Sequence, residues 1–138
     1  QYLRDALGKG VRVPIWLDEG LGEVFYPGTF GAGGRFVLKE NTGRREVARD
    51  AVADGTAPTL EKLLAMQRDD LYALESGYAI GWSVTHFLMN DPRYRGSVVA
   101  YLEALRETKD DAKAREKAWT NFTIEQLQRD WKKWVVEE

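Results

Sequence analysis

The sequence contains no cysteine, which excludes a disulfide framework and a thiol nucleophile. It contains one histidine, and a single imidazole with scattered carboxylates cannot build a three-ligand zinc site. Apolar runs are too short to span a membrane, and no secretory apolar segment stands at the start. The net charge of -2 comes without a basic cluster and gives no reason to expect nucleic-acid binding. The compartment stays open, a periplasmic or secreted location of the parent protein included.

Apolar residues make up 43% of the 138 residues, enough for the core of one domain or of a large piece of one. The chain opens without methionine, and residues 1–7 have helical spacing but no N-terminal cap. We therefore expect a fragment whose first helix began further upstream. The uncovered face of that truncated helix would permit an oligomer.

The remaining pattern predicts a mainly α (α+β) fold, a helical bundle with a small β-hairpin. Segments 35–39 and 44–49 flank a turn with Asn and Gly and predict the hairpin, although a helix starting after Gly43 fits equally well. The single domain or fragment is expected to divide into residues 1–58 and a C-terminal helical bundle over 59–138. Helices are expected over 14–26, after Thr59, and over 76–90, 93–106, 110–118 and from a Thr123–Gln126 capping box onward.

The first candidate for chemistry is Glu19, in the segment Trp-Leu-Asp-Glu-Gly-Leu-Gly-Glu that ends at Glu23. A carboxylate among apolar neighbours is costly to bury unless it is paired or holds a metal. Glu19 and Glu23 also stand four residues apart, as on the solvated face of an amphipathic helix. Both interpretations stay open. Gly20 and Gly22 weaken the helix by roughly 1 kcal/mol each relative to alanine, which indicates close packing.

The second candidate is Tyr78, near the start of the strongly apolar helix expected over 76–90. On the residues alone it can equally be a core aromatic whose hydroxyl bonds to backbone. His86 lies two turns further, roughly 12 Å along the same helix, which does not favour convergence with Glu19. We therefore expect a structural or core histidine. Three tryptophans near the C-terminus are expected to close the bundle: Trp119, Trp131 and Trp134.

The segment Pro14-x-Trp16-Leu17-x-Glu19-Gly20-Leu21 resembles the Trp-Leu-x-Glu-Gly segment of gluzincin zinc metallopeptidases. It is similar to the large zinc aminopeptidases and closer still to peptidase MA-like bacterial domains of unassigned substrate. In that group one helix carries His-Glu-x-x-His, and a second helix supplies a Glu as third zinc ligand, which falls on Glu19. Eighteen residues separate the second His from that Glu in the aminopeptidases, and residues 1–18 precede Glu19. The His-Glu-x-x-His motif is thus expected to end just before Gln1.

The resemblance continues at Tyr78. In the aminopeptidases a Tyr-x-x-Gly segment follows the ligand Glu by some sixty residues, and its Tyr stabilises the oxyanion of the tetrahedral intermediate. Tyr78 stands 59 positions after Glu19, and Gly81 matches the glycine. In thermolysin-like relatives an acidic residue at the offset of Glu23 orients a zinc-bound His from the second shell. The aminopeptidases lack that acid, so a solvated Glu23 is the competing interpretation.

The resemblance implies the C-terminal portion of a zincin-like catalytic domain, from a zinc-dependent peptidase that acts on a peptide or protein substrate. Zinc is expected in the full-length parent and not in this fragment, which is predicted to be inactive alone. The alternative is a non-catalytic helical interaction or scaffold domain, including a degenerate peptidase relative that has lost its metal. His-Glu-x-x-His immediately upstream of Gln1 would distinguish the two.

Overall fold

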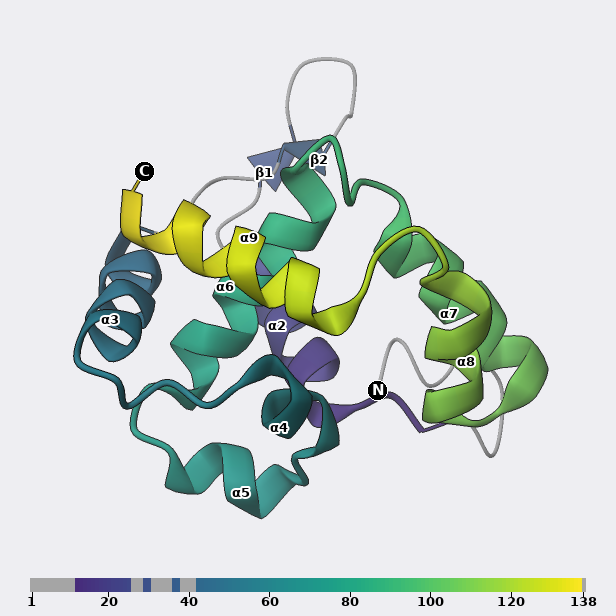
Figure 1. Ribbon diagram of the computed structural model, residues 1–138, viewed down its shortest axis with the longest axis horizontal. Coiled ribbons are helices and arrows are strands. Elements are labelled where there is room, and N and C mark those ends of the chain that lie inside the picture. Colours follow the sequence, from purple (N-terminus) through teal and green to yellow (C-terminus); the bar gives the residue numbers. More distant parts are fainter. Residues whose placement is uncertain (1–11, 26–28, 31–35, 38–41, 138) are drawn as a thin grey trace.

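The computed structural model describes residues 12–25, 29–30, 36–37 and 42–137, and this part is almost entirely helical (Figure 1). In α2 the side chains are described as far as Leu21. The predicted helix tail over 1–7, with the oligomer expected through it, lies outside the described residues. The helices of the described part are α2 (Ile15–Phe25), α3 (Thr42–Ala53), α4 (Leu60–Ala65), α5 (Arg68–Ala73), α6 (Gly77–Asn90), α7 (Ser97–Thr108), α8 (Asp111–Ala118) and α9 (Ile124–Glu137).

Most helix boundaries agree with the sequence pattern. The helices expected over 14–26, 76–90 and 110–118 correspond to α2, α6 and α8. The Thr123 hydroxyl accepts a hydrogen bond from the Gln126 N–H at 3.0 Å, which confirms the cap of α9. The helix expected from residue 93 begins only at Ser97, because Gly96 has a left-handed φ of 90° that a helix cannot contain.

The hairpin predicted over residues 35–49 is wrong, because its second strand, 44–49, lies inside α3. Buried positions recur there with helical spacing, at Arg45, Ala48 and Ala51, whereas Val47 is 42% exposed. The alternative of a helix near Gly43 is therefore the one observed. Within the described residues, strand pairing is limited to two-residue segments, β1 (Thr29–Phe30) and β2 (Phe36–Val37), with Thr29 opposite Val37. The architecture is a helical domain.

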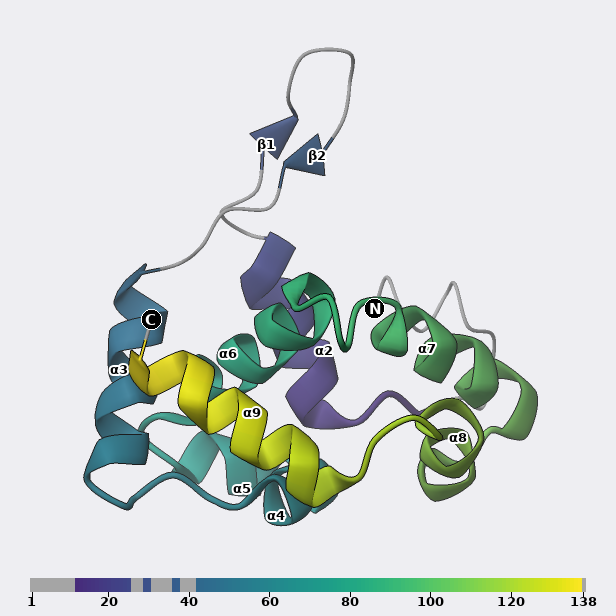
Figure 2. The same cartoon turned by 45° about the horizontal axis from the view of Figure 1, so that its top comes forward.

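Helix α6 lies at the centre of the molecule. Helix α9 crosses over it on one side, and α2 lies against it on the other (Figures 1 and 2). Helices α3 and α5 also pack on α6, and α7 and α8 form a pair beside it. One hydrophobic cluster joins residues from before and after position 58, so both predicted parts share a core.

No helix of the described ranges is long and apolar enough to cross a membrane. The buried positions of α6 are Gly77, Ala79, Ile80, Gly81, Trp82, Ser83, Val84, Thr85, Phe87 and Leu88.

The C-terminal tryptophans close this core, as expected. Trp131 is fully buried, and its indole N–H donates to the Ser83 hydroxyl at 3.0 Å, which joins α9 to α6. Trp119 is 7% exposed, and Trp134 is partly buried against the core. Arg45 of α3 donates to the Trp134 carbonyl oxygen at 2.9 Å. A guanidinium at the last turn of α9 satisfies a carbonyl and matches the negative end of the helix dipole.

Candidate functional site

Helices α2 and α6 approach closely at Gly20, and this approach places the two candidate residues. A β-carbon at Gly20 would overlap the Thr85 hydroxyl and lie 2.7 Å from the carbonyl oxygen of Gly81. Only glycine fits this position without a shift of α6. The close packing expected of Gly20 is therefore confirmed. Glu19 directly precedes this contact on α2, and Tyr78 lies one turn before Gly81 on α6.

Glu19 accepts a hydrogen bond from a tyrosine that the sequence pattern did not single out. The Tyr72 hydroxyl donates to Glu19 Oε1 at 3.0 Å. Arg68 Nη1 lies 3.7 Å from the same oxygen, but the Arg68 side chain is 58% exposed, so solvent screens this ion pair strongly. The Glu19 side chain is 23% exposed. It is neither a fully solvated surface carboxylate nor a buried one, and its nearest described partner is a neutral phenol.

Tyr78 contacts the aromatic ring of Tyr72. Its ring stacks on that of Tyr72, with centroids 5.4 Å apart and planes 21° from parallel. The guanidinium of Arg44, on α3, lies over the Tyr78 ring at 5.9 Å from its centroid. Tyr78 is half-buried. The structure thus brings Glu19 and Tyr78 together through one intermediate side chain, Tyr72 of α5.

The Tyr72 phenol keeps its proton throughout the physiological pH range. Hydrogen bonding with the Tyr78 hydroxyl contributes most to raising the pKa of Tyr72, followed by burial and by the Glu19 carboxylate, and the pKa reaches about 12. A phenolate beside the Glu19 carboxylate would place two negative charges together. At neutral pH Tyr72 is therefore a hydrogen-bond donor to Glu19.

A complete metal site is not formed by the part of the chain that the structure describes, since no group of three His, Cys, Asp or Glu side chains there could hold an ion. The side chain of Glu23, which was predicted to orient a zinc-bound His, lies outside the described residues. His86 stacks on both Trp82 and Trp134, at centroid distances of 5.0 and 5.7 Å. It is the structural histidine that its sequence position predicted. Glu19 is therefore the one predicted metal ligand that the described part contributes.

Tyr72 and Arg68 are the residues that sequence reasoning missed. They lie four positions apart on α5, a helix of six residues that has too few turns to show apolar periodicity. A signal was nevertheless present at its start. The Asp70 carboxylate accepts a hydrogen bond from the Gln67 N–H at 3.1 Å, and an acidic residue three positions after a polar one is typical of a helix N-terminus.

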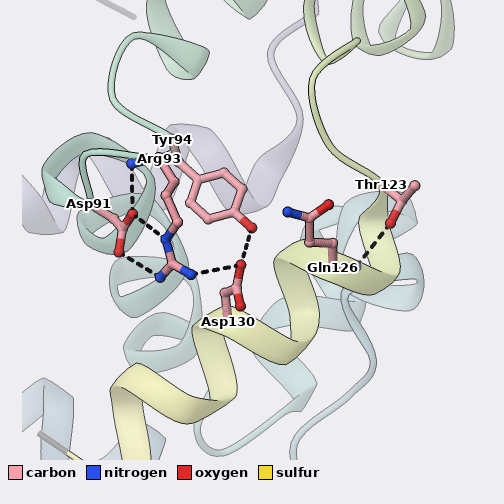
Figure 3. A network of polar contacts seen from close by, with 6 residues as sticks. All are labelled: Asp91, Arg93, Tyr94, Thr123, Gln126 and Asp130. Carbon is pink, nitrogen blue, oxygen red and sulfur yellow. Dashed lines mark hydrogen bonds and ion pairs between the residues drawn. The ribbon is translucent and has the colours of Figure 1, made fainter.

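A second polar cluster joins the α6–α7 turn to α9 (Figure 3). The Asp91 carboxylate binds the Arg93 guanidinium through two hydrogen bonds, of 2.9 and 3.0 Å. Arg93 also lies 3.2 Å from Asp130, which accepts a hydrogen bond from the Tyr94 hydroxyl at 2.5 Å. The bonds from Arg93 lower the pKa of Asp91, and burial together with the Asp130 carboxylate raises the pKa of Tyr94. Each of these side chains is hydrogen-bonded or ion-paired to another of the cluster. The cluster therefore fixes α9 to the α6–α7 turn.

Comparison with known families assigns the chain to a family. The sequence profile of a family described as a protein of unknown function (DUF1570) matches residues 8–112, well over half of the chain. The chain belongs to this family. Searches of curated proteins and of solved structures gave no match. The family description states no activity, and the gluzincin resemblance therefore rests on the residues around Glu19 and Tyr78.

Proposed function

We propose that this chain is the C-terminal part of a zinc-dependent peptidase of gluzincin type, in which Glu19 is the third zinc ligand and Tyr78 binds the oxyanion. The observation that supports it is that two residues 59 positions apart in the sequence both contact Tyr72. The resemblance named these two residues independently of any contact between them. Two residues of one reaction centre must lie near each other, and a shared contact with Tyr72 supports that nearness.

Glu19 suits the role of one ligand among several. A carboxylate is an accepted zinc ligand, and ligating carboxylates usually accept a hydrogen bond from a neighbouring group, as Glu19 does from Tyr72. The remaining ligands are assigned to the His-Glu-x-x-His motif expected before Gln1. Bound zinc would polarise the scissile carbonyl and activate water.

Tyr78 would act by donating its hydroxyl proton in a hydrogen bond to the negative oxygen that develops on the scissile carbonyl. The stack on Tyr72 and the guanidinium of Arg44 hold its ring between α5 and α3. A ring restricted by these two contacts needs little reorganisation when the oxyanion forms. The substrate class implied is a peptide or protein.

The test uses a longer protein that includes the residues preceding Gln1, in three forms: wild type, Glu19→Gln and Tyr78→Phe. Glu19→Gln should lose zinc affinity and peptide cleavage together, because a ligand is removed. Tyr78→Phe keeps the ring and should retain zinc and the fold, while cleavage slows by about 10²–10³-fold. Zinc affinity is measured by competition with a chelator, and the cleavage rate with a fluorogenic peptide.

Two results would contradict the proposal. A wild-type longer protein that binds no zinc would favour the non-catalytic helical interaction or scaffold domain. Unchanged turnover in zinc-loaded Tyr78→Phe would make Tyr78 a core aromatic. The 138-residue chain serves as the control. It should bind zinc no more tightly than a surface carboxylate does in calorimetry, because its described part offers only Glu19.

A further inference from the structure

Three side chains form a hydrogen-bonded series with a fixed direction at the Glu19 carboxylate. Arg68 Nη1 donates to the Tyr72 hydroxyl oxygen at 2.7 Å, and Tyr72 donates to Glu19 Oε1 at 3.0 Å. A guanidinium can only donate, and an ionised carboxylate can only accept. The Tyr72 oxygen must therefore accept from Arg68, and its hydroxyl hydrogen can be donated to Glu19, with the Tyr78 hydroxyl as a second neighbour. The Arg68 guanidinium also lies 5.6 Å from the Tyr72 ring centroid, which restricts the phenol further.

The ring of Tyr72 makes a contact of its own, in addition to the hydrogen bonds of the hydroxyl. It stacks on Tyr78 nearly in parallel, while the hydroxyl reaches Glu19 on another helix. Tyr72 is nevertheless 42% exposed, far more than a side chain whose role is to fill the core. Tyr94 and Tyr101, which also donate to carboxylates, are 2% and 0% exposed. Tyr72 is thus a surface residue with specific contacts to Arg68, Glu19 and Tyr78.

We propose that Tyr72 is a positioning residue for the zinc peptidase site, whose hydroxyl orients the Glu19 carboxylate and whose ring orients Tyr78. This inference rests on the proposed function. Tyr72 acts through its two neighbours, each of which has its own measurable property. A hydrogen-bonded carboxylate has a preferred orientation toward the metal, and loss of such an outer-shell partner typically weakens metal binding by about 10–100-fold. A stacked Tyr78 has a preferred ring orientation toward the oxyanion.

The experiment separates the hydroxyl from the ring. In the longer protein, Tyr72→Phe deletes the hydroxyl and keeps the stack, and Tyr72→Leu deletes both. Zinc affinity should fall by about 10–100-fold in both variants. At saturating zinc, kcat should fall less in Tyr72→Phe than in Tyr72→Leu, where we expect a loss of about tenfold or more, because only Tyr72→Leu removes the ring that orients the oxyanion donor. The chelator competition and the peptide assay give these two values independently.

Tyr101→Phe is the matched control. Tyr101 donates to the Asp111 carboxylate at 2.6 Å, as Tyr72 does to Glu19, but between α7 and α8. Its loss should lower the midpoint of thermal unfolding and leave zinc affinity unchanged. Unaltered zinc affinity in Tyr72→Phe, with a wild-type protein that does bind zinc, overturns the positioning role alone. A wild-type protein without zinc binding overturns the proposed function, and the role of Tyr72 with it.

Discussion

Gly20 directly follows Glu19 in α2 and faces α6 at a point where a β-carbon has no room. We expect Gly20→Ala to destabilise the fold by about 1–3 kcal/mol, the usual cost of overpacking a close helix contact. The added methyl group meets both the Thr85 hydroxyl and the Gly81 carbonyl oxygen, so α2 must move away from α6. The free energy of unfolding in urea measures the change.

Two further variants show whether the overlap is the cause. Gly81→Ala adds a β-carbon that would lie 3.2 Å from the Trp16 carbonyl oxygen, a milder contact, and it should cost less than Gly20→Ala. Thr85→Ala removes the hydroxyl that the methyl group meets. It should therefore recover part of the stability in the Gly20→Ala background. Additive effects of the two changes would mean that Gly20 matters for another reason.

At this scale the sequence could predict residues that a motif carries, and it could not predict their partners. Glu19, Tyr78 and Gly20 each stand in a short segment with recognisable chemistry or spacing. The zinc-ligand and oxyanion roles stay predictions. Tyr72 has no such segment around it, and its bond to Glu19 spans 53 positions of the chain. A contact of that kind depends on how three helices pack, which local patterns do not encode.

The connection between the α6–α7 turn and α9 makes stability depend on pH. The pKa of Asp91 is lowered in the folded state, so folding favours its carboxylate form. This contribution is complete above the ordinary aspartate pKa of about 4 and is lost as the pH falls through the lowered value. We expect Asp91→Asn to cost about 0.5–1 kcal/mol near neutral pH, because Arg93 is largely exposed, and nearly nothing in strong acid.

Urea unfolding of wild type and Asp91→Asn, at neutral pH and again in strong acid, measures this difference. Glu103→Gln, on the exposed face of α7, controls for the loss of one negative charge. The control should show a small difference that is similar at both pH values. A cost of Asp91→Asn that persists in acid would assign it to the turn geometry instead, since Asp91 Oδ1 also accepts from the Arg93 backbone N–H at 2.9 Å.

Among the elements, α6, α8 and α9 could be predicted from the sequence, whereas α3 stayed ambiguous and α5 was missed. The pattern of α6 is apolar on every side, and that of α9 repeats an aromatic stripe, so both stand out in the sequence. Helix α3 buries mainly Arg45, Ala48 and Ala51, a set with little apolar signal. Partial alternation of polar and apolar residues, with Asn and Gly in the preceding turn, suggested a strand instead. Burial of an arginine stem and two alanines becomes apparent only when α6 and α9 are in place.

For the molecule as a whole, α6 is the element through which the candidate site is assembled. It carries Tyr78, it receives α2 with Glu19, and α3 and α5 pack against it. The family that the chain matches extends over residues 8–112 and so includes all of these helices. Helix α9 crosses α6 on the side away from α2 (Figure 2) and is held there by the Trp131–Ser83 bond. Variants that loosen α9 should therefore affect stability before they affect the site.

The close contact of α2 with α6 also bears on the order of folding. It joins distant parts of the chain, whereas α7 and α8 are neighbours that pair locally. Closing a long loop costs entropy before its contacts form, so local pairs generally form first. We expect Gly20→Ala to raise the unfolding rate by about 5- to 150-fold, the equivalent of its cost in stability, and to leave the folding rate nearly unchanged in stopped-flow measurements. A matching fall in the folding rate would place the contact before the barrier. If the contact forms last, partly folded chains do not yet hold Glu19 and Tyr78 beside Tyr72, and any chemistry at this site has to wait until the fold is complete.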